Sequence, residues 1–161
     1  MENRIHILDT QINNLNMSET LALVSKTIEN RRQIHHVVVN AGKIVAMQKD
    51  PDLRKSVNES DIINPDGQAV VWASRFLGKP LKERVAGIDL MANLVEMAYQ
   101  KNYKIFLFGA KEEVVKSVVE KYSEIYSPDL IAGYRNGYFS PEEEERIAQQ
   151  IADSGTQMLF V

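Results

Sequence analysis

The chain has 161 residues, a length typical of one domain, and its 44% hydrophobic and 25% charged residues are those of an ordinary globular protein. This composition excludes a disordered or fibrous chain, and the net charge of -3 argues against a nucleic acid partner. The absence of cysteine excludes disulfides, thiolate nucleophiles and cysteine-based zinc sites.

The sequences at the two ends of the chain allow predictions about membrane contact and about a further segment. Residues 1–10 lack the apolar run of a signal peptide, and no segment reaches the ~20 apolar residues of a membrane-spanning helix. We therefore expect a cytoplasmic chain whose contact with a membrane is peripheral. Residues 157–161 have the pattern of a buried strand, and because domains rarely end inside a core strand, we expect a further segment beyond Val161.

Strand-like and helix-like patterns alternate along the first half of the chain. Strand patterns occur at 4–8, 36–39 and 61–64, and helix patterns at 18–30, 41–48, 51–57 and 68–77, before a polar loop at 78–86. Ser18, Asn40 and Asp50 are the expected helix N-caps, and Pro51 suits the first helical position after Asp50.

The same alternation continues in the second half and decides the fold class. Helix patterns lie at 89–101 and 112–126, strand patterns at 104–108, 130–132 and 158–161, and a helix start at 140–143. Six strands alternating with helices predict an α/β, Rossmann-like fold with a mostly parallel sheet and helices on both faces. Because the chain has no internal repeat or linker, we expect residues 1–161 to form a single α/β domain.

In such sheets, ligands bind beyond the carboxyl ends of the strands. The residues that follow the expected strands are Asn40, Asp66, Gly109 and Gly133. Asp66 belongs to the turn Asn64-Pro65-Asp66-Gly67, where it either caps the next helix or points into the cleft as a general base.

Arg84 is the candidate cation, in the polar loop before Gly87-Ile88-Asp89. Its guanidinium could hold a diphosphate bidentately and neutralise a leaving nucleotide, or it could be a solvated surface side chain. Backbone amides at Gly87, where the next helix starts, could also face a phosphate.

Two later turns, Gly109-Ala110 and Gly133–Tyr138, are either nucleotide contacts or plain connections between a strand and a helix. Neither matches G-x-G-x-x-G or a Walker loop, so dinucleotide and P-loop sites are poorly supported. Asp50-Pro51-Asp52 has the D-x-D form seen in metal-dependent sugar transferases, but it fits better as a cap and first helical turn. We expect no metal site and no cofactor.

Five ordered blocks of sequence together resemble a known family. They are Val37-Val38-Val39-Asn40-Ala41, Asn64-Pro65-Asp66-Gly67, Arg84-Val85-Ala86-Gly87-Ile88-Asp89, Phe106-Leu107-Phe108-Gly109-Ala110 and Gly133-Tyr134-Arg135-Asn136-Gly137-Tyr138-Phe139. The chain is similar to the WecG/TagA/CpsF family, glycosyltransferase family 26, over essentially its whole length, and most of all to the teichoic-acid branch of that family.

The resemblance implies an inverting, metal-independent transfer of N-acetylmannosamine from its UDP donor to undecaprenyl-diphosphate N-acetylglucosamine, which starts wall teichoic acid. It implies Asp66 as the base that deprotonates the acceptor and Arg84 as the holder of the donor diphosphate. Further substrate contacts are expected at Asn40, Val38, Gly67, Gly87, Asp89, Gly109, Ala110, Gly133 and Tyr138.

Two departures from the family pattern bear on activity. The family often has Thr where this chain has Val38, which removes a hydroxyl, and it continues past the last strand into a C-terminal appendage that seats on the membrane. The alternatives are therefore a weak or silent nucleotide-sugar-binding domain, or transfer of N-acetylmannosaminuronic acid. A nicotinamide-dependent oxidoreductase is suggested only by the alternation of strands and helices. Self-association is left open.

Overall fold

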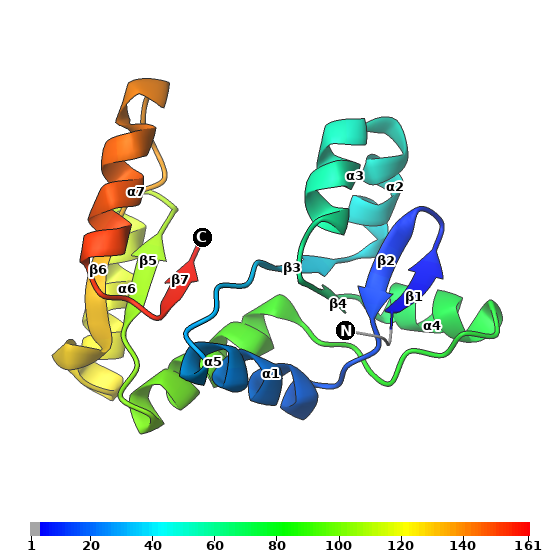
Figure 1. Ribbon diagram of the computed structural model, residues 1–161, viewed down its shortest axis with the longest axis horizontal. Coiled ribbons are helices and arrows are strands. Elements are labelled where there is room, and N and C mark those ends of the chain that lie inside the picture. The colour runs from blue at the N-terminus through cyan, green and yellow to red at the C-terminus, as the bar shows by residue number, and fades with distance from the viewer. Residues whose placement is uncertain (1–3) are drawn as a thin grey trace. The chain divides into compact units, whose positions relative to one another are not determined.

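The computed structural model describes residues 4–161 and divides the chain into two compact units, Met1–Leu90 and Met91–Val161 (Figure 1). The first unit contains β1 (Arg4–Ile7), β2 (Thr10–Asn13), α1 (Met17–Glu29), β3 (His36–Val39), α2 (Ala41–Lys49), α3 (Pro51–Asn58), β4 (Ile62–Pro65) and α4 (Gln68–Phe76). Helix α5 (Gly87–Gln100) begins in the first unit and ends in the second. The second unit contains β5 (Ile105–Phe108), α6 (Glu112–Ile125), η1 (Pro128–Leu130), β6 (Ile131–Arg135), η2 (Pro141–Glu143), α7 (Glu144–Asp153) and β7 (Met158–Phe160).

Parallel pairing dominates, and the predicted α/β class is confirmed. In the first unit β3 pairs with β4, with Val38 opposite Asn64 and Val39 opposite Pro65. In the second unit β5 lies between β6 and β7 and is parallel to both. Helices flank these parallel strands (Figure 1). The strands of residues 4–161 are distributed over three sheets, so the sequence pattern gave the pairing direction but not the division into sheets.

The first sheet is an antiparallel hairpin that the pattern did not predict. Strand β2 pairs with β1 across the two-residue turn Leu8-Asp9, and Leu8 has a φ of 51°. Turns of this length are usually signalled by Asn-Gly or Asp-Gly because they need positive φ, and Leu8-Asp9 is neither. Asn13 then joins β2 to β4, since its Oδ1 accepts a hydrogen bond from Ile63 N at 2.8 Å.

Helix starts follow the predicted chemistry with one correction. Asn40 and Asp50 are N-caps of α2 and α3, as expected, and the Asp50 side chain accepts from Leu53 N at 2.9 Å. The cap of α1 is Asn16 and not Ser18, because Asn16 and Glu19 form a reciprocal capping box. Asp50-Pro51-Asp52 is therefore a helix start in this structure.

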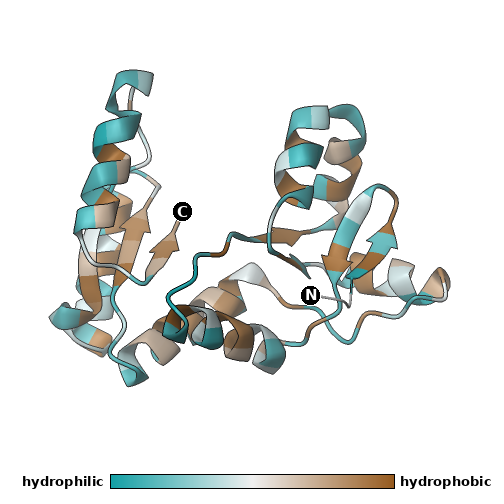
Figure 2. Cartoon of the chain, viewed as in Figure 1, coloured by the Kyte–Doolittle hydropathy of each residue, from teal (hydrophilic) through white to brown (hydrophobic). Residues whose placement is uncertain are grey.

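Each unit has its own hydrophobic core. The core of the first unit consists of Ile7, Ile12, Val39, Ile44, Met47, Val57, Ile63, Val70 and Leu81. In the second unit the buried strand residues Ile105, Phe106 and Leu107 occupy the central strand. Figure 2 colours β3 and β5 mostly as hydrophobic, as expected of strands covered on both faces.

Gly133 lies within a strand and not after one, which corrects the predicted boundary of 130–132. Strand β6 extends to Arg135, and Gly133 faces the ring of Phe106 on β5. A Cβ at Gly133 would lie 2.7 Å from Phe106 Cε2, closer than real contacts allow. The glycine is therefore required by packing, because it leaves room for a ring that is only 1% exposed.

We expect Gly133→Ala to destabilise the chain by about 1–3 kcal/mol, since the new methyl group overpacks against Phe106. The measurement is urea unfolding followed by circular dichroism. Gly42→Ala is the matched control: it adds the same methyl group in α2, where the nearest atom is Asn40 Oδ1 at 3.4 Å, and should be neutral or stabilising. Equal stability of the Gly133→Ala chain and the unmodified chain would contradict the packing role.

Candidate functional site

The candidate site in the first unit lies where β3 and β4 end. The two strands are parallel and in register up to Val39 and Pro65, so Asn40 and Asp66 leave the sheet at the same edge. Asp66 N donates to Val39 O at 2.8 Å, which ties the second turn to the first strand. Both predicted post-strand side chains therefore start from one rigid edge.

The carboxylate of Asp66 has two contacts from the segment that precedes α5. Its Oδ2 accepts a hydrogen bond from Gly87 N at 3.2 Å, and its Oδ1 lies 3.6 Å from Arg84 Nε. Val85 N donates to Pro65 O at 2.8 Å, which holds this segment against the end of β4. The side chains of Asp66 and Arg84 are 28% and 47% exposed, so both can reach a ligand. The structure thus brings the predicted base and cation together.

Close packing explains the two glycines of this group. A Cβ on Gly67 would lie 3.5 Å from Asn40 Cβ, and one on Gly87 would lie 3.3 Å from Val38 Cγ2 and 3.5 Å from Asp66 Oδ2. The methyl groups of Val38 therefore lie beside Gly87. Small residues let the strand ends and the start of α5 approach each other.

Lys43 is a further cation at this edge that the sequence reasoning missed. Its Nζ donates to Val38 O at 3.0 Å, and its backbone N donates to Asn40 Oδ1 at 2.9 Å. A lysine in the first turn of a helix is disfavoured by the helix dipole, and α2 has no acidic residue there. That unfavourable placement was the one signal in the sequence that could have drawn attention to Lys43.

Asp89 lies in the first turn of α5, two residues after Gly87, and is exposed. An acidic side chain in a first helical turn is stabilised by the helix dipole. This position accounts for Asp89 without a ligand, and a substrate contact there stays a prediction.

The remaining predicted site residues, Gly109, Ala110, Gly133 and Tyr138, belong to the second unit. Gly109 and Ala110 form the turn after β5, with φ values of 144° and 58°. Gly109 N donates to Arg135 O, and Gly137 N donates to Ala110 O, both at 3.0 Å. A Cβ on Gly137 would lie 3.2 Å from Gly109 Cα. The turns after β5 and β6 are therefore bonded to each other, with Tyr138 exposed just beyond them.

Side-chain contacts hold the same loop to the helices that follow. Asn136 Nδ2 donates to Glu112 Oε2 at 3.0 Å, and Arg135 donates to Glu143 Oε1 at 2.9 Å. The hydrogen bond from Asn136, followed by that from Lys116, lowers the pKa of Glu112. Arg135 and Asn136 are therefore used to anchor the loop in this structure.

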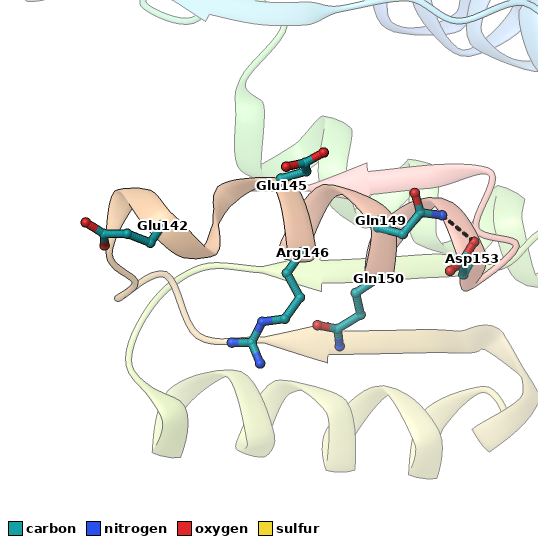
Figure 3. Close-up of a pocket in the computed structure, with 6 residues that line it drawn as sticks. All are labelled: Glu142, Glu145, Arg146, Gln149, Gln150 and Asp153. Atoms are coloured by element: carbon teal, nitrogen blue, oxygen red, sulfur yellow. Dashed lines mark hydrogen bonds between the residues drawn. The ribbon is translucent and has the colours of Figure 1, made fainter.

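A shallow hollow elsewhere in the second unit is lined by η2 and α7 (Figure 3). Its lining residues are Glu142, Glu145, Arg146, Gln149, Gln150 and Asp153. Gln149 donates to Asp153 Oδ1 at 2.7 Å, and Arg146 is already paired with Glu143. Three carboxylates against one paired cation disfavour an anionic nucleotide, and none of the predicted site residues lines the hollow.

Two features of residues 4–161 bear on the predicted metal and membrane properties. No three His, Asp or Glu side chains of this range come together as metal ligands would. None of the helices in the range is long and apolar enough to cross a membrane. Independence from metal stays a prediction.

A chain of polar side chains is buried directly before Asp66. His36 Nε2 contacts Asn64 Oδ1 at 2.9 Å, Asn64 Nδ2 donates to Thr20 Oγ1 at 3.2 Å, and Thr20 Oγ1 donates to Asn16 O at 2.9 Å. Asn64 and Thr20 have no exposed surface. Because buried polar groups are costly without partners, this chain fixes α1 to both strands that carry the site.

Comparison with known proteins identifies the family of this chain. A model of the glycosyl transferase WecG/TagA/CpsF family matches residues 5–161, nearly the whole chain. The chain belongs to this family. The resemblance inferred from the five sequence blocks is therefore confirmed.

Two curated relatives give the family membership more detail. A protein of Bacillus subtilis (strain 168), named N-acetylglucosaminyldiphosphoundecaprenol N-acetyl-beta-D-mannosaminyltransferase, is 40% identical over 123 residues, which are 76% of this chain and 47% of that protein. A protein of the same name from Bacillus spizizenii (strain ATCC 23059 / NRRL B-14472 / W23) is 38% identical over 116 residues, 72% of this chain and 44% of that protein. The matched region thus spans a little under half the length of each WecG/TagA/CpsF relative.

The buried contact of His36 predicts how the stability of this family member depends on pH. Burial is the main cause that lowers the pKa of His36 below its ordinary 6.5, while the bond to Asn64 raises it and the nearby His35 lowers it. As pH falls below 6.5, the unfolded chain takes up a proton that the folded chain does not. The free energy of unfolding should therefore fall, by at most about 1.4 kcal/mol per pH unit for one group.

Urea unfolding at a series of pH values between neutral and mildly acid tests this expectation. His36→Gln should flatten the dependence on pH. The control His6→Gln changes an exposed histidine of β1 and should leave the slope unchanged. The interpretation fails if the slopes of the unmodified chain and the His36→Gln chain coincide.

Proposed function

We propose that the chain is the catalytic core of an inverting glycosyltransferase. It moves N-acetylmannosamine from UDP-N-acetylmannosamine to undecaprenyl-diphosphate N-acetylglucosamine, in the synthesis of the wall teichoic acid linkage unit. The single observation that supports this most is the pair formed by Asp66 and Arg84 at the ends of β3 and β4. The sugar and the acceptor are those in the names of the two relatives, and UDP is the donor nucleotide that the family resemblance implies.

One carboxylate and one cation suit a single displacement. Asp66 accepts the proton of the acceptor hydroxyl as its oxygen attacks the anomeric carbon of the donor sugar. The bond from that carbon to the UDP oxygen breaks, and UDP leaves with the electron pair. Since one displacement inverts the anomeric centre, no second carboxylate is needed as a nucleophile.

Arg84 is placed to stabilise the leaving group. Its Nε lies 3.6 Å from Asp66 Oδ1, and its side chain is 47% exposed. A guanidinium presents these nitrogens as a fork that matches two phosphate oxygens. Arg84 can therefore keep its Nε near the base while its outer edge holds the departing diphosphate.

A second candidate function is a nucleotide-sugar-binding domain with little or no transfer activity. The observation that favours it is Val38, which places methyl groups beside Gly87, whereas the family resemblance implies a hydroxyl at this position. In either case the partners proposed are a UDP-sugar and a lipid-linked acceptor. The location that follows is the cytoplasmic face of the membrane.

Asp66→Asn should reduce transfer to a short-chain lipid acceptor by about 10²–10⁴-fold, because the amide cannot take the proton. Radiolabel transfer from UDP-N-acetylmannosamine measures this, and calorimetric titration with UDP should show binding retained. Asp52→Asn is the control, since Asp52 only occupies the first turn of α3. Near-normal turnover of the Asp66→Asn chain removes the proposed base. UDP binding without transfer by the unmodified chain supports the second candidate.

Arg84→Ala should weaken UDP binding by about tenfold to a hundredfold, since a charge-assisted bond to phosphate is worth about 1.5–3 kcal/mol. The dissociation constant for UDP against that for uridine separates phosphate recognition from base recognition. Arg32→Ala removes an exposed arginine before β3 and should change neither constant. If Arg84→Ala binds UDP and uridine as the unmodified chain does, Arg84 does not hold the diphosphate.

A further inference from the structure

Helix α4 presents large aromatic side chains on its exposed face. Trp72 is 63% exposed and Phe76 is 93% exposed, and Leu77 follows directly at 53%. Trp72 and Phe76 are four residues apart, so they lie about 40° from each other around the helix axis. The opposite face is the buried one, with Val70, Val71 and Ser74. The aromatic residues are thus held outward by a helix that is packed normally on its other side.

Basic residues flank the aromatic pair. Residues 67–82 contain Arg75, Lys79 and Lys82 but no Asp or Glu. Lys82 is paired with Glu19, whereas Arg75 and Lys79 make no ion pair within residues 4–161. We call Trp72, Arg75, Phe76, Leu77 and Lys79 the α4 patch. It combines exposed apolar side chains with two unneutralised cations, and Figure 2 shows both hydrophobic and hydrophilic positions along α4.

The end of the helix fixes the basic part of the patch. Gly78 has a φ of 69° and reverses the chain, after which Lys79 N donates to Ser74 O at 2.9 Å. Ser74 Oγ then accepts from Leu81 N at 3.0 Å, and Leu81 is buried. The backbone of Lys79 is therefore fixed at the end of α4.

We infer that the α4 patch docks on an anionic lipid surface. Tryptophan and phenylalanine insert at the level of the headgroups, while arginine and lysine bind the phosphates and keep their stems along the apolar side chains. Anionic lipids attract each basic residue near the surface. Apolar area and positive charge on one face are the two features that such a surface requires.

The charges argue against a second copy as the occupant. A two-fold interface places the same patch on both subunits, so the cations of one patch would meet a second patch that also carries Arg75 and Lys79. The segment 67–82 offers no carboxylate to neutralise them. An anionic bilayer supplies that neutralisation, and a second copy does not.

The patch is close to the candidate site along the chain. Helix α4 starts two residues after Asp66, and with a rise of about 1.5 Å per residue Phe76 lies only about 12 Å along the axis from Gln68. Docking would therefore hold the Asp66 turn near the headgroups, where the diphosphate of a lipid-linked acceptor lies. This last link rests on the proposed function, but the docking itself does not.

Trp72 is the only tryptophan of the chain, so its fluorescence reports on the patch alone. We expect its emission to shift to the blue with vesicles of phosphatidylcholine and phosphatidylglycerol, and to be quenched by brominated acyl chains. The chain should float with these vesicles and not with phosphatidylcholine alone. Salt near 1 M, where the Debye length is about 3 Å, should release it.

Variants separate the two components of binding. Phe76→Ser should lower the vesicle partition constant by about tenfold or more, since a large apolar side chain is lost. Arg75→Gln and Lys79→Gln should each lower it by about fivefold. Ile125→Ser is the control, because Ile125 on α6 is an exposed apolar residue, at 58%, that lies outside the patch. It should bind as the unmodified chain does.

Several results would overturn the docking. They are the absence of flotation with anionic vesicles, equal binding to neutral vesicles, or partition unaffected by Phe76→Ser. A blue shift that grows with protein concentration without lipid, together with a doubled mass in sedimentation, would assign the patch to a second copy. If the Trp72 emission of the monomer is already blue-shifted without lipid, the α4 patch is covered by another part of the same chain. Vesicle binding without transfer would instead contradict the proposed function alone.

Discussion

The candidate site depends on how one carboxylate is held at the edge of a two-stranded parallel sheet. The backbone of Asp66 is bonded to β3, its side chain accepts from Gly87 N, and Arg84 balances its charge. Each contact fixes a different property: position, direction and electrostatic environment. Because these three contacts fix the carboxylate beforehand, a reaction at this group would need little reorganisation of the protein, and fixed charges of this kind are where enzymes gain most.

The two units contribute different chemistry from the same kind of element. In the first unit, the strand ends carry charged side chains, with Lys43 adding a cation beside Val38. In the second, the strand ends are followed by turns of bare backbone, and a Cβ on Gly137 would lie only 3.2 Å from Gly109 Cα. Charged groups suit proton transfer and diphosphates, whereas bare backbone and an exposed tyrosine suit a flat or neutral group.

The sequence was informative where a local rule decides the outcome. The caps at Asn40 and Asp50, the parallel pairing and the position of Asp66 after β4 each follow from a short pattern. The sequence was uninformative where contacts between residues far apart in the chain decide the local structure. The hairpin of β1 and β2 lacks a turn motif, and the need for glycine at position 133 of β6 comes from the Phe106 ring, which is 27 residues away. The position of Lys43 at this edge could not be predicted, because it depends on the contact of its Nζ with the backbone carbonyl of Val38.

The central place of β5 has a consequence for how the second unit opens. Within residues 4–161, β5 is paired along both edges, whereas β6 and β7 each have one paired edge. Either edge strand can separate alone, but β5 can be released only when both ladders break. Its amide hydrogens should therefore be the last of the unit to exchange with solvent. The Gly109-Ala110 turn is attached to this slowest segment, so it keeps its shape through the fluctuations that loosen the rest of the sheet.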